Sequence, residues 1–575
     1  MLILLVSWIY IFAACTILGT AALYLLHRLC LPGSKSQSAP PALISAFIAG
    51  VIVSAIYVQF ISLLLPVGLV AQIILLALCS FALSRKPVRE TLIAQLKPLK
   101  KGLPLWKALL YIGILCAILF FASRGQEHTD TSTYHALSIH FLEEYGVLKG
   151  LGNLMGNIAY NSSWLPFAAL FSLHFISPLS LHGVNGLLAL VLCIYALEHL
   201  LSYHKHNSHI TDLLDVAVLF YTVVVACVLQ SPATDQPAML FSLYVLTRFA
   251  EETETLSEAP SEEKVHVLSL LSVAAVFSAT LKLSTAPLAL IVLAPALLLI
   301  RNKQFARIGI YIGCGALTIL PFLVRNFFVS GYLVYPFPSV DIFNVDWKIP
   351  LVRTIIESDQ IKTYARTLPE VEQITMGFRE WFPIWLENTE NYDKLLLAAA
   401  FLSAFGFVLM VFKGLLEKKK PNPYILLTFA AAFVCMLFWL INAPTVRFGL
   451  AYLLVLPALF LGSFLTPKKE GVLTLILGFL VIFVLTCIMP YWNHYVTDDL
   501  LFVRHHLTEG YFIAPKDYEQ FDAYTVELGG MTFYRAGSEG KCGYYGFPAC
   551  MRDPKEVELR GETIRDGFRG VIPEE

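Results

Sequence analysis

Long apolar runs recur along almost the whole chain, and they decide what kind of fold it can adopt. Most of them reach the roughly 17–25 residues that an α-helix needs to cross about 30 Å of hydrocarbon. Hydrophobic residues make up 57% of the sequence and charged residues only 14%, which excludes a water-soluble globular protein. The strands of a membrane β-barrel would instead appear as segments of about ten residues with alternating polarity. The sequence therefore predicts an all-α polytopic transmembrane helical bundle.

We expect about 14 membrane spans from these runs. Six runs separate the loop at 124–162 from the loop at 301–307, and these two loops are expected on opposite sides of the membrane. An odd number of crossings is then required, so one of the six runs does not cross. The run at 163–179 is the candidate, because it contains Pro166 and Pro178. We therefore expect it to be a re-entrant element covered by protein. Segment 1–27 lacks a basic start and a small-residue cleavage site, so we expect a retained first span. The runs lie near 1–27, 41–65, 66–83, 105–123, 163–179, 181–202, 212–230, 237–250, 266–283, 285–300, 308–325, 393–413, 424–441, 447–465 and 471–489.

Basic residues gather in four loops that follow apolar runs. By the positive-inside rule these loops face the cytoplasm. Alternation then places loop 124–162, loop 326–392 and the tail 491–575 on the outer side. The net charge of −1 indicates no nucleic-acid partner. The basic residues of the four loops are Arg85, Lys86, Arg89, Lys97, Lys100, Lys101, Arg301, Lys303, Arg307, Lys413, Lys418, Lys419, Lys420, Lys468 and Lys469.

The chain divides into a transmembrane domain, 1–490, and a small outer C-terminal tail, 491–575. The tail is polar, has strand-like runs such as Thr532–Tyr534, and is too short to bury the core of an independent enzyme. We expect an α+β tail packed on the outer loops. Its Cys542 and Cys550 favour a disulfide on the outer side, since no other Cys or His of the tail is near enough to complete a metal site.

The titratable segment Glu127–Asp130 opens the first outer loop. After it, Thr133–Leu148 has apolar residues at near-helical spacing, which predicts an amphipathic helix in the membrane interface. The ordinary interpretation of Asp130 is the N-cap of that helix. One cap does not require Glu127 and His128 as well, and carboxylates near lipid are costly unless they have a partner or a task. The segment therefore indicates a functional site at the outer membrane face.

Other charged residues are predicted at the same membrane depth. Asp235 lies in a turn between two apolar runs, where it is also explained as a plain turn residue. Lys282, Arg325 and Arg447 each lie at the outer end of an apolar run, and snorkelling would explain any one of them alone. Three cations and at least two carboxylates at one depth indicate instead a site for an anionic, lipid-linked group.

These residues resemble the motifs of the GT-C superfamily of polytopic glycosyltransferases. That superfamily has an acidic motif in the first large outer loop, here similar to Glu127–Asp130, and an Arg near a late outer helix end, here Arg447. The Thr234–Asp235 turn resembles that of protein mannosyltransferases and the bacterial aminoarabinose transferase. The chain is also similar to a group of uncharacterised membrane proteins from Bacteroidetes and spirochaetes. The stretches that carry this similarity are Tyr134–His135, Tyr145–Val147, Gly150–Leu151, Asn161–Ser163, Ser231–Pro232, Arg325–Pro336, Ala443–Pro444, Arg447–Phe448 and Cys542–Cys550.

The resemblance implies a hexosyl- or pentosyltransferase in the inner membrane with its site facing the periplasm. It would move a sugar from a polyprenyl-phosphate or diphosphate donor to a cell-surface glycan, lipid or protein. Asp130 would act as general base, with Asp235 and Glu127 beside it, and Asp130 and Asp235 would hold Mg²⁺ or Mn²⁺ if a metal is used. The residues expected to bind the substrate or its phosphate are Lys282, Arg325, Arg447, His128, Tyr134 and His135.

Two other functions fit the same charges. A transporter or flippase would use them to bind a lipid-linked or anionic solute in transit. An oligosaccharide polymerase or ligase would share the chemistry with a longer donor. The sequence shows no inverted repeat with paired broken helices, and its charges gather towards one face, both of which weigh against transport.

Overall fold

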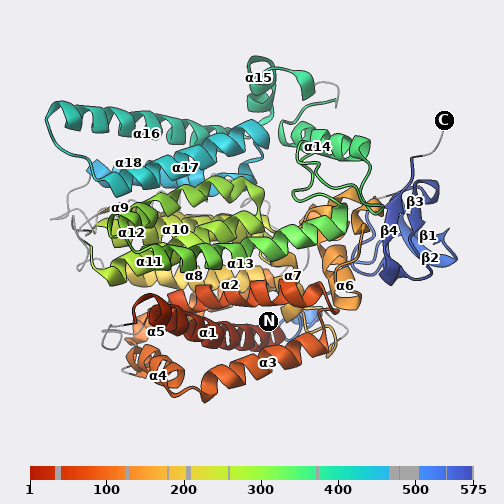
Figure 1. Cartoon of the computed structure of the whole chain (residues 1–575), viewed down its shortest axis with the longest axis horizontal. Coiled ribbons are helices and arrows are strands. Elements are labelled where there is room, and N and C mark those ends of the chain that lie inside the picture. The colour runs from red at the N-terminus through yellow and green to blue at the C-terminus, as the bar shows by residue number, and fades with distance from the viewer. Residues whose placement is uncertain are drawn as a thin grey trace.

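The computed structural model describes residues 1–32, 41–100, 102–124, 128–177, 180–201, 209–254, 256, 260–370, 374–464, 478, 504, 506–538 and 540–572. Most of its long helices run side by side, and the β-strands gather at one end of them (Figure 1). The α-helices are α1 Leu2–Cys30, α2 Leu43–Ser62, α3 Leu69–Ser84, α4 Lys86–Lys100, α5 Leu105–Ala122, α6 Ala136–Glu144, α7 Trp164–Phe171, α8 Val184–Leu201, α9 His209–Val224, α10 Asp235–Glu254, α11 Glu262–Leu281, α12 Leu293–Arg301, α13 Phe305–Ser330, α14 Leu351–Ala365, α15 Phe378–Asn388, α16 Asn391–Leu416, α17 Pro423–Asn442 and α18 Leu450–Phe464. Short helical turns used below are η1 Thr131–His135, η6 Leu283–Val292 and η8 Val446–Phe448.

Nine helices in the described part of the chain are long and apolar enough to cross a membrane, or ten if the bent pair α3–α4 forms one span. The structure therefore confirms a polytopic helical bundle. The run at 163–179 contains α7, which has only eight residues. A helix of that length is about 12 Å long and cannot cross the membrane. This agrees with the expected re-entrant element. The run at 471–489 lies outside the described residues, except for Gly478. The finer total of about 14 spans stays a prediction.

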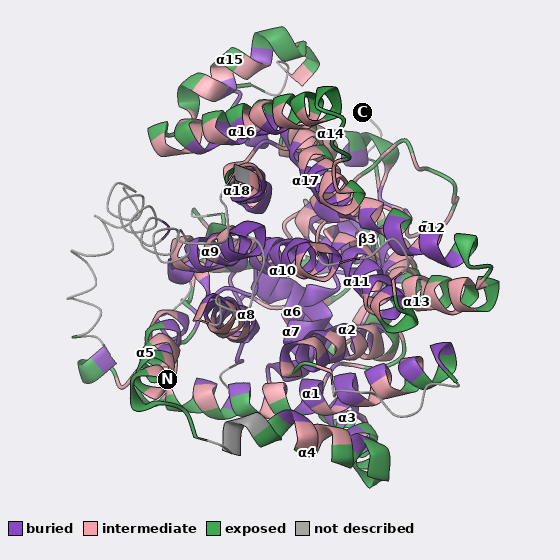
Figure 2. Ribbon diagram, turned by 90° about the vertical axis from the view of Figure 1, so that its left-hand side faces the viewer, coloured by how far each residue is buried: buried purple, intermediate pink, exposed green. Residues whose placement is uncertain are grey.

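Helix α10 lies at the centre of the bundle (Figure 2). Every residue from Ala238 to Leu246 is at most 4% exposed. The helix contacts α8, α9, α11, α17 and α18, which together enclose it. A helix that is apolar all round is stable only when it is surrounded in this way. Because α10 begins at Asp235, its burial fixes the position of that carboxylate.

The basic stretches at α4, between α12 and α13, and after α16 lie at the end of the long helices opposite to the C-terminal strands (Figure 1). Lys468 and Lys469 lie outside the described residues. Helix α13 runs 26 residues from Phe305, close to Arg301 and Lys303, to Ser330 near the tail. Helix α16 also has 26 residues and ends just before Lys418. At about 1.5 Å per residue each helix is about 39 Å long, which exceeds the roughly 30 Å of a hydrocarbon core. The two ends can therefore face opposite sides of a membrane.

The C-terminal tail forms two small antiparallel hairpins. Strand β1 (Ala523–Leu528) pairs with β2 (Met531–Ala536), and β3 (Val557–Leu559) pairs with β4 (Phe568–Gly570). The hairpins have no separate core, because their buried side chains pack against loops of the membrane domain. This shared core includes Leu148, Leu151, Leu154, Ile349, Phe533, Val557 and Phe568. The tail is thus docked on the loops at one end of the bundle.

The sequence predicts that the helix within Thr133–Leu148 lies in the membrane interface, and this location is wrong. Helix α6 occupies the middle of that range, and its Phe141 is fully buried. The tail covers the helix, since the Tyr544 hydroxyl donates a hydrogen bond to the buried Glu143 carboxylate at 2.8 Å. Helix α6 is therefore surrounded by protein, whereas the sequence pattern predicted contact with lipid and water.

The predicted disulfide between Cys542 and Cys550 is also wrong. Both thiols are free and buried. Cys542 Sγ lies 3.6 Å from Met551 Sδ, and the Cys550 thiol donates to the Arg552 carbonyl oxygen at 3.5 Å. Each sulfur thus packs as a small apolar group with its own neighbour. Sequence spacing gave no information on how the two side chains point.

Replacing Gly567 with Ala should loosen the tail from the membrane domain. Gly567 has a φ of +86°, and a Cβ there would lie 2.3 Å from the Lys149 carbonyl oxygen. That oxygen accepts a hydrogen bond from the Phe568 N–H at 2.8 Å. We expect a cost of about 1–3 kcal/mol in docking, measured as faster limited proteolysis of the tail.

The matched control is Gly530→Ala. Gly530 also has a positive φ, +76°, but a Cβ there would meet no atom within 4 Å. It should cost only the backbone strain, about 1 kcal/mol, and leave the tail protected. Equal cleavage rates for the two variants would show that strain, rather than the approach to Lys149, controls docking.

Candidate functional site

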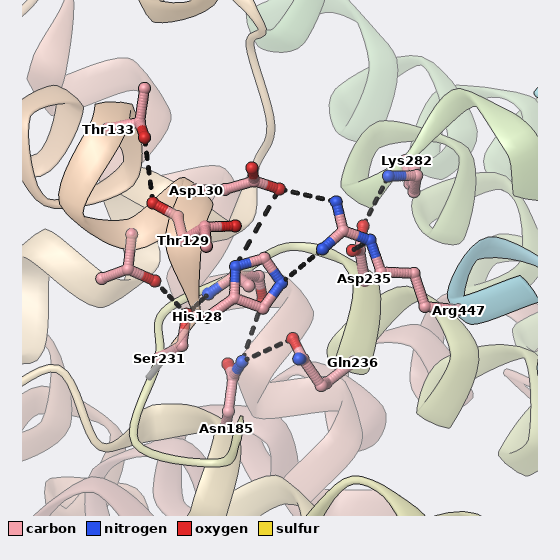
Figure 3. A network of polar contacts seen from close by, with 12 residues as sticks. His128, Thr129, Asp130, Thr133, Asn185, Ser231, Asp235, Gln236, Lys282 and Arg447 are labelled. Carbon is pink, nitrogen blue, oxygen red and sulfur yellow. Dashed lines mark hydrogen bonds and ion pairs between the residues drawn. The ribbon is translucent and has the colours of Figure 1, made fainter. Parts of the chain in front are cut away.

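Four segments that are distant in the sequence meet at the end of the bundle that carries the tail. Asp130 precedes η1, and Asp235 is the first residue of α10. Lys282 follows α11 in an extended conformation, with φ −155° and ψ 131°, which ends that helix. Arg447 lies in η8, the short turn between α17 and α18. Figure 3 shows their side chains pointing toward one another.

The guanidinium of Arg447 joins the two carboxylates. Its Nη2 donates to Asp130 Oδ2 at 2.7 Å, and its Nε lies 3.3 Å from Asp235 Oδ2. The Arg447 Nη1 group donates to His128 Nε2 at 2.9 Å. Only a guanidinium has donors spread widely enough in one plane to reach three such partners. Arg447 therefore holds the Asp130 segment against the start of α10 (Figure 3).

Lys282 pairs with the second carboxylate oxygen of Asp235. Its Nζ donates a hydrogen bond to Asp235 Oδ1. The same Nζ lies 3.4 Å from the centre of the Phe448 ring, a distance at which the ammonium and the ring attract one another. Both oxygens of Asp235 thus face a cation, and its side chain is only 7% exposed. The Asp130 side chain is 27% exposed, so it is the more accessible carboxylate.

The contacts of His128 assign its protonation state. Arginine has only donors, so His128 Nε2 accepts the bond from Arg447 and its proton lies on Nδ1. That Nδ1 lies 3.9 Å from Asp130 Oδ2. Burial lowers the pKa of His128, and the adjacent Arg447 lowers it further. With neutral His128, the two carboxylates and two cations of the cluster balance in charge.

A cavity of about 470 Å³ opens onto this cluster. His128, Asp235 and Arg447 form its polar side. Apolar side chains from α9, the segment after it and α18 form another wall, and residues of α14, α15 and α16 complete the lining. The apolar wall consists of Tyr221, Val224, Val225, Val228 and Leu450. The cavity therefore has the charged cluster at one side, an apolar surface beside it, and two further carboxylates, Glu390 and Asp393, elsewhere in its lining.

Asp130 makes no N-cap hydrogen bond, so the ordinary interpretation of this residue does not hold. Its carboxylate instead contacts Arg447. The structure thus brings together four of the predicted charged residues, namely Asp130, Asp235, Lys282 and Arg447, with His128. Glu127 lies outside the described residues.

The other predicted residues do not contact the charged cluster in the same way. Arg325 is 4% exposed and donates to the Ser162 carbonyl oxygen at 3.4 Å, a contact outside the cluster, and its expected part in phosphate binding stays a prediction. His135 lies beside the cluster, with its ring centre 5.8 Å from that of His128. Tyr134 packs next to His135, with ring centres 4.3 Å apart and ring planes tilted by 58°. Neither residue lines the cavity.

Sequence reasoning missed the residues that brace the cluster. Asn185, within an apolar run, donates to the Ala233 carbonyl oxygen at 2.9 Å and lies 3.3 Å from the Gln236 amide oxygen. A hydrogen bond between Thr131 and Ser231 joins the Asp130 segment to the Asp235 turn. The available signal was the polar side chain of Asn185 near the start of a span, which is costly without a partner.

The expected divalent metal does not fit the observed arrangement. The two carboxylates that would hold it already face the Arg447 guanidinium, and Asp235 also faces Lys282. Within the described ranges no group of three or more His, Cys, Asp or Glu side chains is arranged to hold a metal ion. An ion between Asp130 and Asp235 would have to displace Arg447.

The fold and the cavity define a polytopic membrane protein with a charge-balanced site at one end of its helices. Within that class, residues 1–454 match the family described as "Domain of unknown function (DUF8201)". The chain therefore belongs to the DUF8201 family. The matched range includes every residue of the charged cluster, whereas the hairpins of the tail lie beyond it. No curated protein and no solved structure matches the chain.

The pKa of His128 makes stability depend on pH. The folded state lowers this pKa below 6.5, the value in the unfolded chain. Neutral His128 therefore contributes fully to the free energy of unfolding above about pH 6.5. This contribution is lost as the pH falls towards the folded pKa. Between pH 7.5 and 5.5, the melting temperature of His128→Asn should fall less than that of the wild type. Asn keeps an acceptor for Arg447 but does not titrate. Identical pH dependence of the two proteins would contradict this assignment.

Proposed function

We propose that this protein is a membrane glycosyltransferase that uses a sugar linked to a polyprenyl phosphate or diphosphate. The observation that carries the proposal is a cavity lined by Arg447, Asp235 and an apolar wall. The more accessible carboxylate, Asp130, contacts Arg447, and the Lys282 ammonium contacts Asp235, so both lie directly beside this lining. A lipid-linked sugar has the matching parts, since it combines a polar sugar, an anionic phosphate and a long hydrocarbon chain. The acceptor would be a glycan, lipid or protein at the cell surface.

Asp130 is the proposed general base. Its Oδ2 contacts Arg447, and Oδ1 is left to take the proton of the acceptor hydroxyl. As that proton moves to Asp130, the hydroxyl oxygen bonds to the anomeric carbon, and the bond from this carbon to the phosphate oxygen breaks. Asp235 is poorly suited to this role, because both of its oxygens face cations. Its proposed role is to position Lys282 and Arg447.

The leaving phosphate needs its negative charge stabilised. Arg447 has five N–H groups, and its two hydrogen bonds to Asp130 and His128 leave others for a phosphate oxygen. Lys282 likewise has donors beyond the one used by Asp235. Such preorganised donors are worth most where charge develops during the reaction. The lipid chain of the donor would lie along Val224, Val228 and Leu450.

The proposed orientation places this site on the periplasmic face of the inner membrane. The described basic stretches next to α12 and at the end of α16 lie at the opposite end of α13 and α16. Cytoplasmic loops are typically enriched in Lys and Arg, which supports the orientation. A donor flipped to the outer leaflet would then reach the cavity from the lipid.

Asp130→Asn should abolish transfer with little change in folding. Loss of a positioned general base costs roughly 10²–10⁴ in rate. We would complement a deletion strain and measure the pool of polyprenyl-linked sugars by mass spectrometry. The variant should accumulate the donor as the deletion strain does, and Asp359→Asn, an exchange in α14 outside the cavity, should behave as the wild type. A normal donor pool in Asp130→Asn cells would rule out the base. Movement of lipid across vesicles without transfer would instead favour transport.

Transfer should also be independent of divalent metal, because Arg447 and Lys282 supply the positive charge at the two carboxylates. Purified protein in EDTA should convert donor at the same rate as protein in Mg²⁺ or Mn²⁺. Loss of activity in EDTA and its return with either ion would restore the expected metal site at Asp130 and Asp235.

A further inference from the structure

A second cavity, of about 440 Å³, lies where the C-terminal tail meets the ends of α2 and α13. Its lining includes Lys149 from the outer loop, Phe328 from α13, and Arg560 and Arg565 from the tail. None of these residues lines the cavity of the charged cluster. The second cavity, called the junction cleft below, is therefore a separate place on the molecule.

Two cations of the junction cleft are left without a carboxylate. Arg560 is engaged, since it contacts the Asp346 carboxylate at 2.7 and 3.1 Å and donates to the Asp566 carbonyl oxygen at 2.7 Å. The Asp566 carboxylate accepts two hydrogen bonds from Thr563, at 2.8 and 2.9 Å. Among the described residues, no carboxylate lies within 4.0 Å of Lys149 or Arg565. The cleft thus has unbalanced positive charge.

Docking of the tail holds these two cations at one cleft. The Lys149 carbonyl oxygen accepts a hydrogen bond from Phe568 at 2.8 Å, and the next N–H, that of Gly150, donates to the Phe328 carbonyl oxygen at 2.7 Å. The Lys149 ammonium lies 5.1 Å from the centre of the Trp347 ring. The position of Lys149 is therefore fixed by both the membrane domain and the tail, while Arg565 comes from the tail alone.

The junction cleft opens beside surface that suits lipid. Leu63, just after α2, lines the cleft, and the next residue, Leu64, is 79% exposed. Helix α2 is one of the helices able to cross a membrane. Tryptophan, here Trp347 beside Lys149, is enriched where a protein passes from hydrocarbon to headgroups. These features suit a cleft at the depth of lipid phosphates.

We propose that Lys149 and Arg565 bind the phosphate of an anionic phospholipid in the leaflet on the side of the tail. An arginine fork and a lysine ammonium are both good partners for phosphate oxygens. The acyl chains of the lipid would lie against Leu64 and the end of α2. Because the two cations come from different domains, one lipid would hold the tail against the membrane domain.

The test measures binding of short-chain phosphatidylglycerol to the full-length protein in detergent. Phosphatidylcholine of the same chain length and inorganic phosphate are the comparison ligands. Phosphatidylglycerol should bind most tightly, and Lys149→Gln combined with Arg565→Gln should weaken it about 30-fold, as expected for two interfacial cations. Lys555→Gln, which removes an exposed cation of the tail outside the cleft, should leave binding unchanged.

Three results would overturn the proposal. Equal binding of phosphatidylcholine would show that negative charge is not recognised. Equal binding of inorganic phosphate would show a site for free phosphate rather than for a lipid. Unchanged affinity in the double variant would place the lipid elsewhere. Both side chains are exposed, so their replacement leaves the buried core intact, and the melting temperature of the variant would verify this.

Discussion

The contact of Arg447 with two carboxylates is the interaction on which the candidate site depends. The three residues come from the turn after α17, from the segment before η1 and from the start of α10. A carboxylate close to lipid is costly unless a cation accompanies it. One guanidinium meets that need for both Asp130 and Asp235, and Lys282 adds a second cation at the more buried of the two.

The sequence predicted the bundle and much of the site for one physical reason. Apolar and charged side chains have opposite costs in hydrocarbon, so run length reveals spans and isolated charges reveal special positions. Asp130, Asp235, Lys282 and Arg447 were found in this way. Arg325 gave the same signal, yet it contacts the Ser162 carbonyl oxygen. Membrane depth can be read from sequence, whereas the direction in which a side chain leaves its helix depends on packing.

The incorrect predictions concern the tail and what it covers. Spacing made Cys542 and Cys550 look like partners and made the segment around α6 look interfacial. In the structure each thiol has another neighbour, and Tyr544 covers Glu143 of α6. The contact of Tyr544 with Glu143 joins residues 401 positions apart, and such a pairing leaves no local pattern. The thiol contacts are local, but the spacing of two cysteines does not reveal which neighbour each sulfur meets. The bracing by Asn185 was visible only as a polar residue without a known partner.

The shared core of the tail and the outer loops also has a consequence for biosynthesis. The hairpins are made after the helices of the bundle, and their Phe533 and Phe568 become buried only against loops made much earlier, which include Leu148 and Ile349. The tail therefore cannot complete its fold until the helices that carry those loops have been inserted and assembled. A chain with a misplaced span would leave both partners exposed, and exposed apolar surface is what chaperones and proteases recognise. Docking of the two hairpins thus depends on prior assembly of the helices that carry these loops.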